Sequence, residues 1–239
     1  PRDNEMGRRM TDHDGAPRTR VEATFNALRQ DIINGELEPG SRLAVEHLRA
    51  RYGVGSSTIR EALSLLIADA LVTAEGQRGF TVKPMSVTDL RDLSNVRVLI
   101  ESYALTESIK HGDDDWEARI VAAFHRLSKA QERVDAGDEA AIPEWEIRNR
   151  AFHTALTANC TSPWAHHMLA TLHHHSERYR RLALVDDTEP RDVHSEHEAL
   201  MNATLERDSE TASDVARDHI LNTTEVIAQL AERTSAISP

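Results

Sequence analysis

Four polar side chains fall on helical faces that are otherwise apolar, and their donor atoms suit a metal ion. Asn149 and His153 lie four residues apart, so a helix would place them one turn apart on the same face. His197 and His219 each fall on the apolar stripe of a later segment. A buried polar group without a partner costs a few kcal/mol, on the order of 2–7. Because neutral imidazoles commonly bind Zn²⁺ and similar ions, one divalent metal would satisfy all four.

Spacing alone does not select this set. A single inward histidine is more often a hydrogen-bonded core or interface residue than a metal ligand. The chain has 13 histidines, and His167 and His174, seven residues apart, are a competing pair. They belong to a cluster that spreads around its helix and is predicted to be a solvated surface: His166, His167, His173, His174 and His175.

Arg97 is a further candidate. A planar guanidinium can clamp the acid group of a ligand, but Glu101 lies four residues later and a helical ion pair explains the same spacing. The sequence places no general base or nucleophile beside the four polar residues. Glu196, next to His197, is predicted to point about 100° away on its helix. The pattern therefore favours a binding site without catalytic residues.

The segments that carry these residues are predicted to be helical. No alternating strand pattern or fixed repeat occurs in residues 85–239, so this part is predicted to be an all-α bundle. Trp116, Trp145 and Trp164 are expected in its core. The predicted helices span about 86–111, 114–136, 141–159, 162–185, 191–206 and 208–234.

The composition limits the class of protein. The 239 residues, 39% of them hydrophobic, allow one large or two smaller domains. Cys160 is the only cysteine, so an intrachain disulfide is excluded and a cytoplasmic location is expected. The sequence has no membrane-spanning apolar run of about eighteen residues. Residues 1–17 are charged, lack the apolar region of a signal peptide and are predicted to be a disordered arm.

Residues 18–84 are predicted to form a small separate domain. One helix carries an apolar stripe through Leu28 and Ile32, a short second helix ends at "YGVG", and Ser56 or Ser57 is expected to cap a third. Alternating residues around "EGQRG" predict a two-stranded wing. Such an arrangement reads DNA with its last helix in the major groove. Periodicity alone leaves a protein-binding module equally open. The outward residues of the third helix are Ser57, Thr58, Arg60, Glu61 and Ser64.

The charge distribution bears on this choice. The chain has a net charge of −12, yet residues 1–84 hold twelve basic and twelve acidic side chains. The whole excess of negative charge therefore lies in the remainder. Because affinity for DNA depends on cations at the contact surface, a neutral domain with arginines gathered on one face can still bind a polyanion.

The stretch "RYGVGSSTIREALSLLIADALV…RGFTV" resembles the winged helix-turn-helix of GntR-type transcriptional regulators, whose usual form runs Leu-Gly-Val-Ser-Arg-Thr-Pro-Val-Arg-Glu-Ala-Leu. Residues 60–63 keep the Arg-Glu-Ala-Leu portion. Ser56 stands where the family has an Arg that helps hold DNA, and Thr58 replaces the usual Pro, so one contact per subunit is expected to be missing. The resemblance implies DNA contacts by Ser57, Thr58 and Arg60 of the recognition helix and by Arg78 and Gly79 of the wing. Arg49 and Arg51 are expected to contact phosphates or to be solvated surface charges.

Residues from about 88 to 232 resemble the ligand-binding domain of the FadR branch of these regulators, called FCD. Its marks here are Arg97-x-x-x-Glu101, "FH", "EHEAL" and "DHI". Many such domains hold a divalent metal, so the resemblance implies zinc, with nickel or manganese as alternatives, at Asn149, His153, His197 and His219. Asn149 departs from the commoner Asp. A neutral amide oxygen is a weaker ligand than a carboxylate, so metal affinity or preference is expected to differ.

The leading hypothesis is a homodimeric regulator, not an enzyme, that represses transcription from a palindromic double-stranded operator. Its effector is expected to be a small carboxylic acid bound at the metal, with Arg97 as a further contact. Two alternatives are also compatible with the sequence. One is a metal-dependent helical enzyme acting on a small organic acid, and the other is a protein-interaction module with metal-free histidines.

Overall fold

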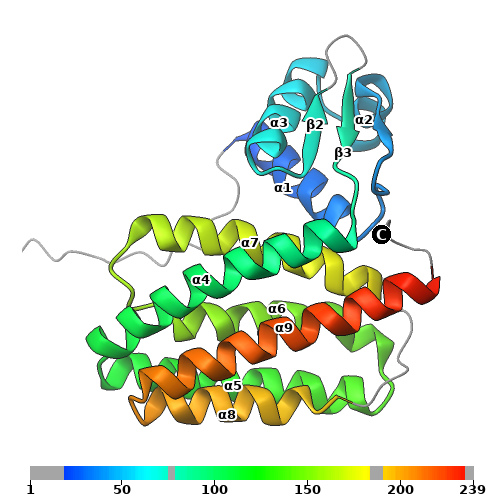
Figure 1. Ribbon diagram of the computed structural model, residues 1–239. Coiled ribbons are helices and arrows are strands. Elements are labelled where there is room, and N and C mark those ends of the chain that lie inside the picture. Colours follow the sequence, from blue (N-terminus) through cyan, green and yellow to red (C-terminus); the bar gives the residue numbers. More distant parts are fainter. Residues whose placement is uncertain (1–18, 75–78, 184–190, 235–239) are drawn as a thin grey trace, which may run out of the picture. The chain divides into compact units, whose positions relative to one another are not determined.

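The computed structural model describes residues 19–74, 79–183 and 191–234 (Figure 1). These belong to two compact units. The first comprises Pro1–Ile32 with Ser41–Lys83, and the second comprises Ile33–Gly40 with Pro84–Pro239. The predicted arm at 1–17 and the predicted DNA contact Arg78 lie outside the described residues. No described helix is long and apolar enough to cross a membrane.

The first unit is a small helical domain with the predicted inward residues at its centre. Ile59, Leu63 and Leu66 of the third helix are fully buried, as are Leu28 and Ile32 of the first. The second helix ends at a glycine with a φ of 65°, a conformation that glycine adopts at little cost and that stops the helix before the third begins. The helices are α1 (Arg20–Ile33), α2 (Val45–Tyr52) and α3 (Ser56–Ala68).

The sheet of this unit has one strand more than the sequence predicted. β2 (Val72–Ala74) and β3 (Phe80–Val82) form the predicted antiparallel pair. β1 (Arg42–Leu43) pairs with the other edge of β3, so the strand order is β1-β3-β2. Two residues are too few to show an alternating pattern, which explains why β1 was missed.

The second unit is the predicted all-α bundle. α4 packs against α9 and α7, α5 packs against α6 and α8, and α8 packs against α9 (Figure 1). A short 3₁₀ turn at Glu139–Ala141 precedes α6. The helices are α4 (Val87–His111), α5 (Asp114–Asp135), α6 (Ile142–Leu156), α7 (Pro163–Ala183), α8 (Val193–Leu205) and α9 (Ser209–Thr234).

Side-chain caps fix where three of these helices begin. The Ser86 hydroxyl accepts a hydrogen bond from the Asp89 N–H (3.0 Å) at the start of α4. The carboxylates of Asp113 and Asp192 do the same for α5 and α8. Each cap satisfies a backbone donor that the first turn of a helix leaves free, which is worth about 1 kcal/mol.

The core of the bundle lies next to the candidate site. Trp116, Phe152 and Leu200 are fully buried in one cluster, and the Phe152 ring meets the edges of the His153 and His197 rings at centroid distances of 5.7 and 5.4 Å. Trp164, predicted as core, is instead 72% exposed near the start of α7. That prediction was wrong because a large apolar residue at a helix start can face outward while its neighbours pack inward.

A single arginine ties two corners of the bundle together. Arg207 lies just after α8 in the sequence. Its guanidinium donates to the carbonyls of Ile109 (2.7 Å) and Gly112 (3.1 Å) at the end of α4. It also lies over the Trp116 ring, 5.3 Å from the centroid. A Cβ at position 112 would lie 2.1 Å from the Trp116 ring, so only glycine fits there. These bonds satisfy carbonyls that a helix end leaves free.

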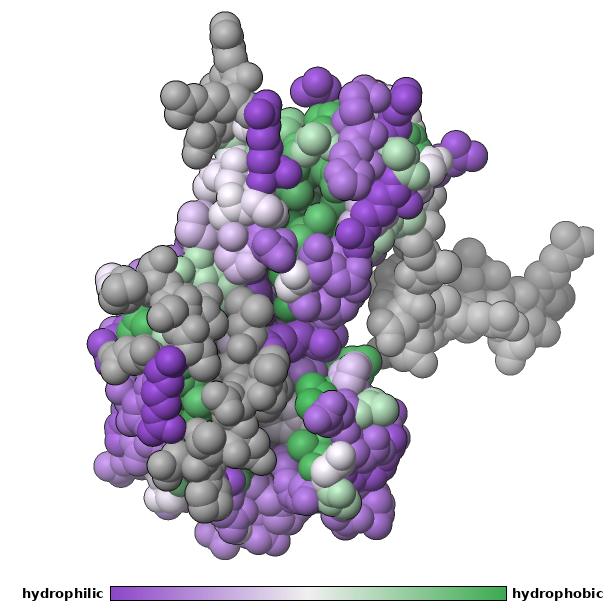
Figure 2. Space-filling model, turned by 90° about the vertical axis from the view of Figure 1, so that its right-hand side faces the viewer, coloured by the Kyte–Doolittle hydropathy of each residue, from purple (hydrophilic) through white to green (hydrophobic). Residues whose placement is uncertain are grey.

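One face of the molecule is largely polar. On the face shown in Figure 2, hydrophilic residues cover most of the described surface, and hydrophobic residues form small separate groups. This distribution follows from the amphipathic stripes, which turn their apolar sides to the core.

Candidate functional site

Three of the predicted metal ligands converge in the interior of the second unit. His153 of α6, His197 of α8 and His219 of α9 each offer one ring nitrogen, and these atoms lie within 4.8 Å of one another. The three residues are 2%, 1% and 7% exposed. The structure thus brings together side chains from α6 and from the later, consecutive helices α8 and α9.

Several buried polar atoms at this place have no hydrogen-bond partner among the described residues. They are Oδ1 of Asn149, Nε2 of His153 and Nε2 of His197. Asn149 precedes His153 by one turn of α6 and is also buried. An unpaired buried polar atom costs about 1–3 kcal/mol. Imidazole nitrogens with an amide oxygen are suitable donors for a divalent metal, so the residues present fit such an ion.

Glu101 joins several of the predicted site residues. Its carboxylate accepts from Arg97 Nε (2.8 Å), from His153 Nδ1 (2.8 Å) and from His173 Nε2 (3.3 Å). Arg97 therefore forms the helical ion pair that the sequence left as one of two alternatives. Contact between Arg97 and an effector remains a prediction. The contact of His173, a histidine of α7, with Glu101 was not predicted from the sequence.

A second carboxylate supports His219. Glu196 of α8 accepts from His219 Nδ1 (2.7 Å) and from Arg191 Nε (2.7 Å). Arg191 also donates to the His219 carbonyl (3.0 Å). Glu196 turns away from His197 on its own helix, but α9 brings His219 to it. Neither Glu196 nor Arg191 was predicted as a supporting residue.

The electrostatics favour neutral imidazoles. Burial lowers the pKa of His153 and of His219 to about 4, although the neighbouring carboxylates act in the other direction. Burial also holds the pKa of His197 well below its ordinary value. Near pH 7 all three rings are therefore uncharged, which is the form that binds metals.

Both supporting carboxylates stay ionised. Burial raises the pKa of Glu101, but Arg97 and His153 outweigh it and hold that pKa well below the usual value. Burial acts on Glu196 in the same direction, yet its bonds with His219 and Arg191 lower its pKa to about 2. An ionised carboxylate can only accept hydrogen bonds.

The histidine cluster of α7 is only partly a solvated surface. His167 is exposed, but His173 and His175 are buried, so that prediction was wrong for these two. The buried side of α7 carries charged residues, so the sequence pattern does not show which side of this helix faces the core. Glu177 pairs with Arg150 (2.9 Å), and Arg180 pairs with Glu146 (2.8 Å) of α6.

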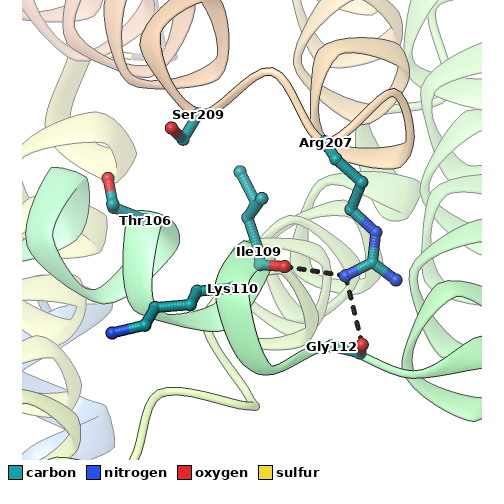
Figure 3. Close-up of a pocket in the computed structure, with 6 residues that line it drawn as sticks. All are labelled: Thr106, Ile109, Lys110, Gly112, Arg207 and Ser209. Atoms are coloured by element: carbon teal, nitrogen blue, oxygen red, sulfur yellow. Dashed lines mark hydrogen bonds between the residues drawn. The ribbon is translucent and has the colours of Figure 1, made fainter.

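The surface pocket in Figure 3 is a different place. Ser209, which lines it, and His219 are ten residues apart on α9, or roughly 15 Å along a helix axis. None of its lining residues is a predicted ligand. They are Thr106, Ile109, Lys110, Gly112, Arg207 and Ser209 (Figure 3).

The predicted DNA-contacting residues of α3 lie on its outer side. Ser57 and Arg60 are exposed, Thr58 is partly exposed, and Arg60 forms no ion pair with the described residues. Arg49 of α2 is exposed and pairs with Glu46 (3.3 Å). Gly79, just before β3, has a φ of 95°.

The expected cap of α3 was wrong. Gly55 is the N-cap and provides no side-chain bond, and Ser56 is already the first residue of the helix. The N–H groups of the first turn of α3 therefore receive no side-chain cap from the N-cap residue.

Two family models match the chain. The one described as "Bacterial regulatory proteins, gntR family" covers residues 20–82, and the one described as "FCD domain" covers residues 92–222. The chain is 46% identical over 212 residues to the uncharacterized HTH-type transcriptional regulator BphR of Paraburkholderia xenovorans (strain LB400), which covers 89% of this chain and 86% of the relative.

Two Escherichia coli proteins are also similar. The HTH-type transcriptional repressor GlaR of strain K12 is 37% identical over 209 residues, covering 86% of this chain and 94% of GlaR. The solved structure of McbR/YncC superposes with a TM-score of 0.74 over 88% of this chain and 98% of that one. Its sequence identity of 21% supports similarity of fold alone.

Proposed function

Because the chain belongs to the gntR family of bacterial regulatory proteins and carries an FCD domain, it is a transcriptional regulator, and we propose that it is a repressor controlled by a small carboxylic acid at a divalent metal. The metal site is supported by one observation: three buried imidazoles converge where several buried polar atoms have no hydrogen-bond partner among the described residues. Its relatives are regulators rather than enzymes, and the repressor name of GlaR supports the direction of control.

We assign DNA contact to the outer side of α3. We assign to Arg60 the contact with a base edge, because arginine can donate two hydrogen bonds to guanine in the major groove. Ser57, Thr58, Arg49, Arg78 and Gly79 are the proposed supporting contacts. The uncapped N–H groups at the start of α3 favour a phosphate, which a helix N-terminus attracts.

The proposed metal ligands are Asn149, His153, His197 and His219. Imidazole donors favour Zn²⁺ or Ni²⁺ over Mn²⁺, which prefers oxygen ligands. All four ligands are uncharged, so a bound divalent ion would supply two positive charges that attract a carboxylate effector. Arg97 is kept as a predicted second contact for that effector.

A homodimer is supported by exposed apolar side chains on α4 and α7. The two helices run antiparallel, since Tyr179 near the end of α7 bonds to Asp89 at the start of α4 while Ala104 packs with Ala165. Tyr103 and Trp164 directly precede these two packed alanines in the sequence. Because the helices are antiparallel, residues that directly precede a contact residue lie on the same side of the helix pair in both helices. We call this surface the α4–α7 face. It includes Val96, Leu99, Tyr103, Trp164 and Met168, which are 42–72% exposed.

Such a surface suits a second copy of the chain. Exposed apolar patches mark interaction sites, and a twofold dimer would present two α3 helices to the halves of a palindrome. Effector binding can change operator affinity only if it prefers one arrangement of the dimer over another.

The Leu99→Glu/Trp164→Glu double variant is expected to sediment as a monomer, because burying two carboxylates in an apolar interface is unfavourable. Operator affinity should fall with it, since one α3 reads only half a site. Ile147→Glu is the matched control, because Ile147 of α6 is 51% exposed and lies outside the α4–α7 face. A double variant that still sediments as a dimer would refute this interface.

The proposed function is tested by gel-shift titration with a duplex selected by the protein from random sequences. The Zn²⁺-loaded protein should form a specific complex that weakens steeply with salt, as expected when phosphates are neutralised. A panel of small carboxylic acids should contain members that release the duplex. If no specific complex forms, DNA recognition fails. If the complex forms but its affinity changes with neither metal nor carboxylic acids, DNA recognition stands and only the proposed regulation by metal and effector fails.

A further inference from the structure

We propose that Glu101 and Glu196 are positioning residues that fix the ring tautomer of His153 and His219, so that Nε2 of each ring faces the metal site. This inference rests on the proposed metal site. It assigns roles to two glutamates that lie outside the predicted ligand set, and it rests on two separate chains of contacts.

The first chain of contacts runs from α4 to α6. Arg97 Nε donates to Glu101 Oε2 at 2.8 Å, and Glu101 Oε1 accepts from His153 Nδ1 at 2.8 Å. All three side chains are at most 6% exposed. His153 Nε2, on the other side of the ring, has no partner among the described residues.

The second chain of contacts joins Arg191, α8 and α9. Arg191 Nε donates to Glu196 Oε1 at 2.7 Å, and Glu196 Oε2 accepts from His219 Nδ1 at 2.7 Å. Arg191 also donates to the Thr223 hydroxyl (2.7 Å) of α9. The order arginine, glutamate, histidine is thus repeated with residues from entirely different elements.

The chemistry of the ring explains what these contacts do. A neutral imidazole has one N–H and one lone pair, and a carboxylate can only accept. A ring that faces a carboxylate with Nδ1 must carry its proton there, which leaves the lone pair on Nε2. Carboxylates in this position also orient the ring and raise its basicity as a ligand. The arginines hold each carboxylate in place by charge-assisted bonds.

The two glutamates differ in how cleanly they can be tested. Glu101 also accepts from His173 (3.3 Å) and is 3% exposed, so its replacement disturbs a buried network. Glu196 has a 25% exposed side chain, which makes it the better target. Glu198 lies on the same helix and is exposed, so it provides a matched control.

The test compares Glu196→Gln with Glu198→Gln. Zn²⁺ affinity, measured by competition with a chromophoric chelator, is expected to fall about 10–100-fold in Glu196→Gln and to stay unchanged in Glu198→Gln. ¹⁵N NMR of the metal-free protein should show His219 protonated at Nδ1 in the parent and a mixture of tautomers in Glu196→Gln. A structural role alone would leave the tautomer unchanged.

Two results would count against the proposal. Zn²⁺ affinity within twofold of the parent in Glu196→Gln, with an unchanged tautomer, overturns it while leaving the metal site in place. Undiminished Zn²⁺ binding by His219→Ala overturns the metal site itself, and this inference with it.

Discussion

Replacing Arg60 with alanine is expected to weaken binding of the selected operator duplex by about thirtyfold or more. Arg60 is exposed on α3 and forms no ion pair with the described residues, so its guanidinium is available to a base edge. A good arginine–base contact contributes about 1–3 kcal/mol, and a dimer makes it twice, which gives about 2–6 kcal/mol. Specificity should relax at the contacted base pair.

The measurement is a fluorescence-anisotropy titration at fixed salt with the selected duplex and with substituted duplexes. Arg126→Ala provides the control, since it removes the same charge from an exposed position on α5 in the other unit. Equal affinity of Arg60→Ala and the parent for the selected duplex would rule out the assigned reading surface.

Replacing His197 with alanine is expected to abolish stoichiometric metal binding. The parent should retain about one Zn²⁺ per chain after dialysis, and the variant close to none, because one of three converging imidazoles is lost. The loss should exceed the roughly 10–100-fold effect of removing a supporting residue. A ligand at 1,000 times its Kd stabilises a protein by about 4 kcal/mol, so Zn²⁺ should raise the melting temperature of the parent only.

Elemental analysis after dialysis measures the stoichiometry, and thermal unfolding with and without a chelator measures the stabilisation. His125→Ala is the control, because His125 is an exposed histidine of α5. A parent protein without stoichiometric metal, or a variant that retains it, contradicts the site.

Much of the fold could be predicted because periodicity and breakers act locally. The predicted helix at 86–111 corresponds to α4 at 87–111, and the others agree to within a few residues at most ends. β1 was missed because two residues carry no pattern. The orientation of α7 was misjudged because its buried side includes Glu177 and His173, whose partners lie on other helices. The pattern of polar and apolar residues along one helix cannot show ion pairs with other helices.

The site was predictable only in part, for a similar reason. His153, His197 and His219 were recognised from inward positions together with a family resemblance, not from spacing alone. On α8, Glu196 points in a different direction from His197, and the sequence of one helix shows nothing of contacts with another helix. The partner of Glu196 is His219, and only the packing of α9 on α8 brings the two together.

The corner at Arg207 restricts which substitutions can occur together. Glycine at 112 leaves room for the Trp116 ring, and that ring in turn forms the surface beneath the guanidinium that closes the end of α4. A side chain at 112 would require a smaller residue at 116, and Arg207 would then lose its contact with the Trp116 ring. Positions 112, 116 and 207 should therefore covary among relatives as one evolutionary unit.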